Sequence, residues 1–549
     1  MFKKTIIKRA LETNNDVSNN QPSAKQDCSD VVHISVFFDG TGNNKDVDEE
    51  NKQWSNPARL WRNADLLTKE KDKSNYAIYV SGVGTRFNAE LNIFQRAISI
   101  LQDNTGLGLG VGLGGSRRLD YGEDQLNDAL KKALILNAKK AEVDVDKYAN
   151  QKKDYSFSEV EKSLSQHRLI KKINLSIFGF SRGAALARAF TNQFMWQCNS
   201  SCDGLTYGEG KYPIEFKFLG IFDTVASFGL PATNLNNNLT FKGRDLVIDE
   251  RVKMCVHHIA GNELRFAFPV DLIHKENGEL ANPNWKEIVY PGMHSDVGGG
   301  YTPGSQNVND NFARIPLKDM LADAVSSGVR MYDYDELQKK HEKVFEQQFA
   351  IRDETQRLFD AVNAKMQCDG KIQDKIIASM KVYYSAYGTL ARSNTASVSQ
   401  EVRNENKIRE LIPIGPSDMA TEISRLQRFK DLTAPSKTGG FNIFRVLSPV
   451  SKAYEFFLGI DDWEFTSWES NVSKDIVDFY QGYVHDSKYG FISNAEPFSY
   501  FRQRTVYESR RSDQGKKVDQ NSVEQNNLCS IPKKEIKQEE IYNTYQGIK

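Results

Sequence analysis

The feature that most constrains this chain is a serine between two glycines, at the point where a strand pattern changes to a helix pattern. Gly179, Ser181 and Gly183 form a G-x-S-x-G motif within the run INLSIFGFSRGAALARAF at 173–190. The β-branched and apolar residues before the serine favour a buried strand, and the alanines after it favour a helix. The pattern predicts a nucleophile elbow, a strained turn that projects Ser181 into a pocket. The alternative is a tight turn whose small residues serve packing only.

Two later strand ends supply the acid and the histidine that such a serine needs. In α/β-hydrolases the acid and then the histidine follow the serine, each after a later strand. The apolar run FKFLGIF at 216–222 is followed by Asp223, and the short run KEIVY at 286–290 leads into a glycine-rich segment that contains His294. We predict that His294 takes the proton of Ser181 and that Asp223 orients the imidazole ring.

Other acids and histidines compete for these roles. The chain has eight histidines, and position and order favour His294. Its rival is His485, in the run YVHDS, and the rivals of Asp223 are Asp296 and Asp245. Asp296 and His485 are therefore also predicted to lie at the pocket.

A loop after an earlier strand is expected to complete the site. The β-branched and aromatic run HISVFF at 33–38 ends in DGTGNN, and ligand contacts in α/β folds come from such loops. We predict that the oxyanion hole is formed by the backbone N–H of Arg182, at the positive end of the new helix, and by that of Gly40 or Thr41. Asp39 is expected to orient this loop.

Two motifs suggest other chemistry, but neither stands in the sequence context that this chemistry needs. A strand followed by D-G-T-G is also typical of aspartyl phosphatases, but Thr41 stands where a second aspartate belongs and no later acidic pair is placed to hold magnesium. A G-x-G-x-x-G pattern at Gly110, Gly112 and Gly115 follows a helical pattern, so we interpret it as a closely packed or flexible loop. No cofactor and no metal are predicted.

Four blocks in this order resemble a known family. They are FFDGTGNN at 37–44, FGFSRGAALAR at 178–188, IFDTVASFG at 221–229 and YPGMHSDVGGGY at 290–301. Together they resemble the Tle1-type phospholipases, antibacterial effectors of the bacterial type VI secretion system. The resemblance covers roughly residues 30–330 and, weakly, the HDS block near 485; beyond 330 little else matches.

The resemblance implies an α/β-hydrolase core with Ser181, Asp223 and His294 as its triad, acting on acyl esters of membrane glycerophospholipids. It also implies two protein partners, a spike protein of the secretion machine and a cognate immunity protein. The protein would be made in the cytoplasm and delivered by the type VI system to the membrane or periplasm of a target cell.

Composition excludes some classes of function. Lysine plus arginine and aspartate plus glutamate both number 72, so the charge balance does not favour nucleic acid as a partner. The first residues lack the apolar core of a signal peptide, and no run of eighteen apolar residues is present. Six cysteines are too few for a disulfide framework, and Cys198 and Cys202 are the close pair among them.

The chain is expected to divide into four parts. Residues 1–30 form a disordered segment, 31–330 an α/β-hydrolase domain with a mostly parallel sheet, 331–508 a helical or mixed cap for membrane or partner docking, and 509–549 a charged, disordered tail. Aromatic residues crowd the span 441–468. We interpret this span as a second small core, with a lipid-contacting surface or a lid as alternatives.

The sequence thus predicts a serine-dependent lipolytic hydrolase of phospholipase A type. Two alternatives remain. One is an esterase or acyltransferase for a soluble substrate, and the other is a binding or carrier protein that uses a hydrolase fold as a scaffold.

Overall fold

The computed structural model describes residues 30–70, 73–83, 110–145, 155–226, 246–393, 419–427, 462–488 and 500–509, apart from a few single residues and pairs within these ranges. Several predictions concern residues outside this part of the chain: the two disordered ends, the aromatic span up to 461, the part of the predicted cap at 394–418, Asp245 and Cys202.

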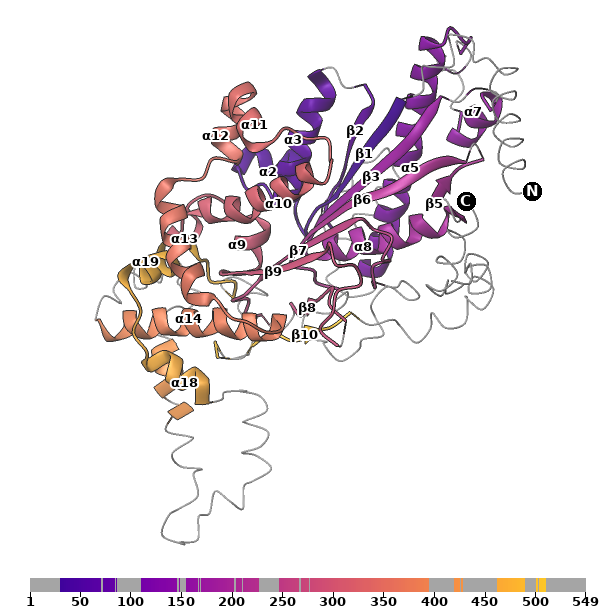
Figure 1. Cartoon of the computed structure of the whole chain (residues 1–549). Helices are drawn as coiled ribbons and strands as arrows, with labels where there is room; N and C mark the ends of the chain where they lie inside the picture. Colours follow the sequence, from indigo (N-terminus) through magenta and orange to yellow (C-terminus); the bar gives the residue numbers. More distant parts are fainter. Residues whose placement is uncertain are drawn as a thin grey trace, which may run out of the picture.

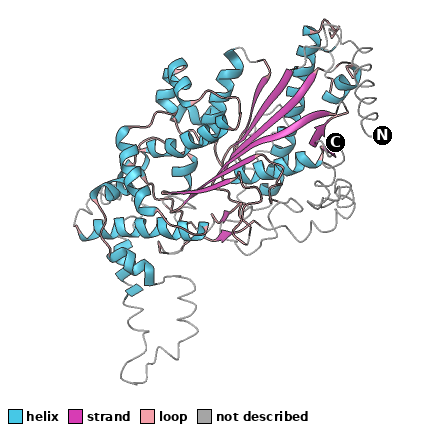
Figure 2. Cartoon of the chain, viewed as in Figure 1, coloured by secondary structure: helices cyan, strands magenta, loops and turns pink. Residues whose placement is uncertain are grey.

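A parallel sheet forms the centre of the molecule (Figure 2). Its parallel strands, in spatial order, are β2 (Asn75–Val80), β1 (Asp30–Phe38), β3 (Ile170–Phe180), β6 (Tyr212–Phe222), β7 (Met254–Ala260) and β9 (Lys286–Tyr290). Each of the six runs that the sequence predicts to be strands lies within one of these strands: 33–38, 76–80, 173–178, 216–222, 254–260 and 286–290. The mostly parallel α/β fold predicted from the sequence is therefore confirmed.

Short strands that the sequence did not predict extend this arrangement. The antiparallel strands β4 (Asn199–Ser201) and β5 (Gly204–Tyr207) pair beside the first half of β6. A separate two-stranded parallel ribbon joins β8 (Val270–Asp271) to β10 (Val506–Tyr507). This ribbon brings the end of the described chain back to the sheet.

Helices cover both faces of the sheet, which is why the strands are apolar on both sides (Figure 1). Successive strand residues alternate between two hydrophobic clusters: Phe37 and Phe178 belong to one, Val36 and Ile177 to the other. The first cluster includes residues of α3 (Asn56–Glu70) and α10 (Arg314–Ser326). The second includes residues of α5 (Gly110–Lys140), α7 (Phe157–Ser163) and α8 (Arg182–Trp196).

The prediction of a loop at Gly110, Gly112 and Gly115 is wrong, because these residues begin helix α5. The strongly helix-forming residues that follow extend the helix back into the glycines. Further along α5, Gly122 lies so close to β1 that an added Cβ would be 3.2 Å from the Phe38 ring. Gly122 thus permits close packing of α5 on the sheet.

The region after residue 330 is helical as far as it is described. It contains α11 (Tyr334–Lys340), α12 (Glu342–Gln348), α13 (Asp353–Met366), α14 (Ile372–Arg392), α18 (Asp462–Glu469) and α19 (Lys474–Tyr483). The remaining short elements are α2 (Lys45–Asn51), α9 (His294–Gly298), η1 (Ser305–Asn307) and η2 (Asp310–Ala313). Buried residues of α13, α14 and α19 belong to the same hydrophobic cluster as Phe37 of the sheet. None of the described helices is long and apolar enough to cross a bilayer.

Candidate active site

Ser181 lies at a strained turn between β3 and α8. Its backbone has φ 59° and ψ −127°, a left-handed conformation that is costly for a residue with a side chain. A Cβ on Gly179 would lie 2.4 Å from the carbonyl oxygen of Gly183, and a Cβ on Gly183 would lie 2.3 Å from that of Asp39. Both glycines are therefore required by close backbone contacts. The turn has the geometry of a nucleophile elbow.

Strand register brings Asp223 beside this turn. Phe180 pairs with Phe222, so the residues that follow them leave the sheet at the same level. The Ser181 N–H donates to the carbonyl oxygen of Phe222 (3.0 Å), and the Asp223 N–H donates to that of His258 (2.7 Å). Asp223 also has a positive φ of 41°, and its side chain is fully buried.

His294 begins the short helix α9 and contacts Asp223. Its Nδ1 lies 2.6 Å from Oδ2 of Asp223, and its ring lies 4.6 Å, centroid to centroid, from that of Phe180, the residue before Ser181. Within the described part of the chain Nε2 of His294 has no hydrogen-bond partner, so no Ser181–His294 hydrogen bond is formed. Burial lowers the pKa of His294, although Asp223 partly offsets this effect. The ring is therefore neutral at neutral pH, as a general base requires.

Arg504 binds the same carboxylate and was missed by the sequence reasoning. Its Nη1 donates to Oδ2 of Asp223 (2.7 Å) and its Nη2 to Oδ1 (2.6 Å). Burial alone would raise the pKa of Asp223, but the charge of Arg504 and the bonds from Arg504 and His294 hold it well below its usual range. Asp223 is thus ionised while fully buried. An isolated arginine carries no sequence pattern that signals such a role.

A second buried ion pair holds the backbone of His294. Oε2 of Glu263 accepts the N–H of His294 (3.1 Å), and the Arg265 guanidinium donates to both oxygens of Glu263 at 2.9 Å. Burial would raise the pKa of Glu263, but Arg265 outweighs it and lowers this pKa to about 2. Ser487, near the end of the described chain, donates to Oε1 of Glu263 (2.9 Å). Sequence reasoning missed this group too.

The loop after β1 lies directly against the elbow helix, as its predicted role requires. The Gly40 N–H donates to Oδ1 of Asp39 (2.7 Å), and the Tyr79 hydroxyl donates to Oδ2. Nε of Arg182 donates to the Thr41 hydroxyl. Because the Gly40 N–H is already used, Thr41 is the better candidate for the second oxyanion donor.

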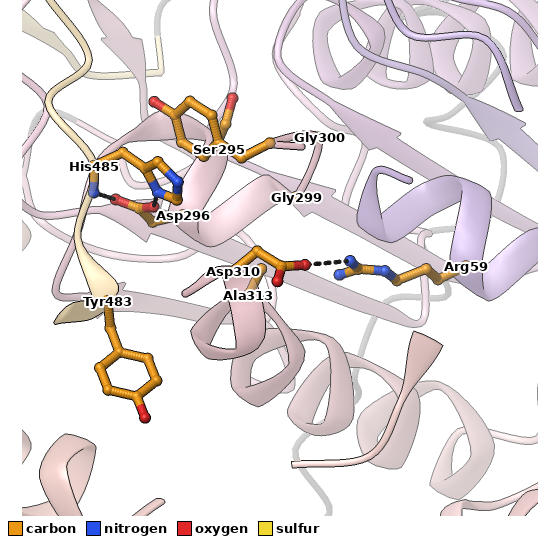
Figure 3. Close-up of a pocket in the computed structure, with 10 residues that line it drawn as sticks. Arg59, Ser295, Asp296, Gly299, Gly300, Asp310, Ala313, Tyr483 and His485 are labelled. Atoms are coloured by element: carbon orange, nitrogen blue, oxygen red, sulfur yellow. Dashed lines mark hydrogen bonds and ion pairs between the residues drawn. The ribbon is translucent and has the colours of Figure 1, made fainter. Parts of the chain in front are cut away.

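Asp296 and His485, the alternatives to Asp223 and His294, bind each other instead of binding Asp223 or His294. Nδ1 of His485 lies 2.6 Å from Oδ1 of Asp296, and its ring stacks on Tyr301 with centroids 3.7 Å apart. Figure 3 shows this pair beside the contact of Arg59 with Asp310 (3.9 Å). The small hollow between them is also lined by Ser295, Gly299, Gly300, Tyr301, Ala313 and Tyr483. This hollow borders the helix of His294, but neither His294 nor Ser181 lines it.

In the ranges that the structure describes, no group of three or more acidic, histidine or cysteine side chains is placed to hold a metal ion.

The sheet order, the elbow at Ser181 and the Asp223–His294 pair at the strand ends define an α/β-hydrolase fold. Residues 199–323 match the family model described as the catalytic domain of Tle1-like phospholipase effectors of the type VI secretion system. The matched span contains Asp223 and His294 and begins after Ser181. It confirms, for that part of the chain, the resemblance to Tle1-type phospholipases.

Two solved structures are similar to the chain. A crystal structure of an uncharacterized protein from Pseudomonas aeruginosa has a TM-score of 0.57 and 22% identity, covering 91% of this chain and 83% of the other. A structure of the Tle1 effector bound to the VgrG spike of the type VI secretion system has a TM-score of 0.38 and 19% identity, covering 64% and 84%. The first similarity shows a shared fold. No curated protein sequence matches the chain.

Proposed function

We propose that this protein is a serine hydrolase that cleaves acyl esters of membrane glycerophospholipids. The observation that carries the proposal is the hydrogen bond between Asp223 and His294 beside the elbow of Ser181. The Tle1-like family match over residues 199–323 supports a phospholipid ester as substrate.

The chemistry follows from the positions of these groups. His294, kept neutral by burial and oriented by Asp223, accepts the proton of the Ser181 hydroxyl while Oγ attacks the ester carbonyl. For this transfer Ser181 Oγ and His294 Nε2 must come within hydrogen-bond reach in the substrate complex, and catalytic hydrogen bonds are often long before substrate binds. Backbone N–H groups of Arg182 and Thr41 would receive the oxyanion. His294 then protonates the departing lysophospholipid, and water releases the fatty acid from Ser181.

The proposal extends to the setting in which the enzyme acts. As a Tle1-like effector it would be delivered by the type VI system, bind a spike protein and be neutralised by an immunity protein in the producing cell. Its site of action would be the membrane or periplasm of the target cell. The family match supports these assignments, and co-purification with the products of neighbouring genes tests the two partners.

The deciding experiment compares wild type with Ser181→Ala on vesicles of phosphatidylethanolamine and phosphatidylglycerol. We expect fatty acid and lysolipid from wild type and a loss of at least ~10³-fold in the variant, because a triad acts as a unit. Mass spectrometry of the lysolipid identifies the acyl chain that is cut. Ser326→Ala, an exposed serine at the end of α10, is the matched control and should retain full activity.

Each alternative function has its own outcome. Full activity in Ser181→Ala would show that the elbow is not the nucleophile. Hydrolysis of short-chain esters without any release from vesicles would favour the soluble esterase. Undiminished toxicity of Ser181→Ala in the periplasm of a test bacterium would favour the carrier protein.

A further inference from the structure

The last two described ranges of the chain, 462–488 and 500–509, contact the candidate active site at two points, and a third contact is made to α9, the helix that His294 begins. Arg504 binds Asp223, Ser487 binds Glu263, and His485 binds Asp296. These contacts join residues separated by 281, 224 and 189 positions in the sequence. All six side chains belong to buried residues. The C-terminal segment is therefore built into the site.

The chain is held on either side of Arg504, by β8 after it and by α14 before it. The Val270 N–H donates to the carbonyl oxygen of Thr505 (3.0 Å), and the Leu272 N–H donates to that of Tyr507 (2.8 Å). On the other side, Phe501 is fully buried and stacks on Tyr384 of α14, with ring centroids 4.9 Å apart. Because the chain is held before and after Arg504, the guanidinium is fixed beside Asp223. The Arg504 side chain is 2% exposed there.

Four donors hold the Asp223 carboxylate. Oδ1 accepts from Arg504 Nη2 (2.6 Å) and from the Ala260 N–H (2.9 Å). Oδ2 accepts from Arg504 Nη1 (2.7 Å) and lies 2.6 Å from Nδ1 of His294. Arg504 also donates to the carbonyl oxygen of Ala260 (2.8 Å). Because the two parallel bonds from arginine fix the carboxylate plane, Oδ2 stays directed at the imidazole.

We propose that Arg504 is a positioning residue of the hydrolase site: it fixes Asp223 and balances its charge, and the C-terminal segment thereby becomes part of the catalytic unit. This inference rests on the proposed function. Arg504 acts through Asp223 and His294 and does not itself touch the substrate.

The positive charge of Arg504 beside Asp223 should affect the pH dependence of catalysis. The charged groups that face His294 are Asp223 after β6 and the pair of Glu263 and Arg265 after β7, and Arg504 lies behind Asp223. η2 also packs against α9, and its Asp310 contacts Arg59. Arg265 is paired with Glu263 and also acts on His294, whereas Arg504 is the cation bound directly to the Asp223 carboxylate. Without it, the negative charge of Asp223 acts in full on the ring and favours the imidazolium. More alkaline solution is then needed to produce the neutral base.

The test compares Arg504→Gln and Arg504→Lys with wild type on vesicles and with a serine-reactive fluorophosphonate probe. For Arg504→Gln we expect kcat to fall by about 10- to 100-fold with little change in KM. The acid limb of the pH profile should move to higher pH, by an amount on the order of one unit. Arg504→Lys keeps the charge without the paired bonds, so its acid limb should stay near that of wild type while kcat remains reduced.

Arg392→Gln is the matched control. Arg392 ends α14 and donates to carbonyl oxygens of Trp468 and Ser470, away from Asp223. It should leave both kcat and the acid limb unchanged. Circular dichroism confirms that each variant is folded, and if Arg504→Gln does not fold, the lower kcat and unmoved acid limb of Arg504→Lys carry the test.

Two further outcomes separate this proposal from the proposed function. A folded Arg504→Gln with the kcat and acid limb of wild type overturns the positioning role and leaves the phospholipase intact. A wild type that ignores vesicles but reacts with the probe at Ser181 overturns the phospholipase, while the pH dependence of probe labelling still decides the role of Arg504. A wild type that does not react at Ser181 overturns both.

Discussion

Asp39 connects the oxyanion loop to the elbow helix. It is 1% exposed, its carboxylate accepts hydrogen bonds from Gly40 and Tyr79, and its backbone oxygen lies against Gly183. Burial raises its pKa to about 7, although hydrogen bonds from Ser55, Tyr79 and Gly40 counteract this. These contacts hold the first residues of the loop, and the role of Asp39 in orienting it stays a prediction. They also place a carboxyl group that titrates near neutral pH beneath the site.

Asp39 should make stability fall with rising pH. Its pKa is about 7 in the folded protein and 3.8 in an ordinary environment, so between about pH 4 and pH 7 the folded state binds more protons than the unfolded state. Over this window wild type should lose about 1 to 4 kcal/mol relative to Asp39→Asn, whose side chain does not titrate. Urea unfolding of both proteins at pH 4.5, 6 and 8 measures the difference. If the unfolding free energies of the two proteins changed with pH in parallel, Asp39 would ionise as readily in the folded as in the unfolded state.

At the scale of elements, α14 is the helix that holds the C-terminal region to the sheet. Ser385 donates to the carbonyl oxygen of Ser467 (2.8 Å), and Arg392 donates to carbonyl oxygens just after α18. Gly388, one turn after Ser385, permits this contact: a Cβ there would lie 1.9 Å from the carbonyl oxygen of Trp468. The two helices therefore meet backbone to backbone.

Substituting alanine for either of two helical glycines, Gly388 and Gly482, should affect stability differently. Gly388→Ala must push α18 away from α14 and should cost about 1 to 3 kcal/mol in the free energy of unfolding. Gly482→Ala, in α19, meets no atom within 4 Å, so it should be neutral or stabilise by up to about 1 kcal/mol. Chemical denaturation of both variants provides the measurement. Equal effects would contradict the close contact at Gly388.

The whole molecule, as far as it is described, shares its hydrophobic interior across the predicted boundary near residue 330. A single cluster contains Phe37 of β1, Met320 of α10, Met380 of α14 and Phe501. The division into a hydrolase domain and an accessory region stays a prediction about function. In packing, the helices after 330 cover one face of the sheet together with α3.

This shared interior should make the sheet and the C-terminal helices unfold together. We expect a single main calorimetric transition, with the fluorescence of Trp463 and Trp468 changing at the same temperature as the far-ultraviolet signal. Each of these tryptophans packs against the shared cluster. A separate early transition reported by Trp468 alone would show that the accessory region folds independently.

The sequence by itself determined the strands, the strand-to-helix turn at Ser181 and the placement of Asp223 and His294 after later strands. The strand runs are rich in β-branched, aromatic and other apolar residues, and a serine between two glycines at a strand-to-helix change is typical of a nucleophile elbow. Parallel strands end at one edge of the sheet, so the residues after β3, β6 and β9 were expected to come together. The pair Asp223 and His294 was predictable for this reason.

Only the tertiary structure decided which partners these residues have. Arg504 binds Asp223 across 281 positions, and no local pattern marks an isolated arginine. Asp296 and His485 were ranked as rivals for the triad, yet they bind each other, because α19 delivers His485 to the far side of α9. Sequence patterns report short-range geometry, whereas buried charges find their partners through the packing of distant segments.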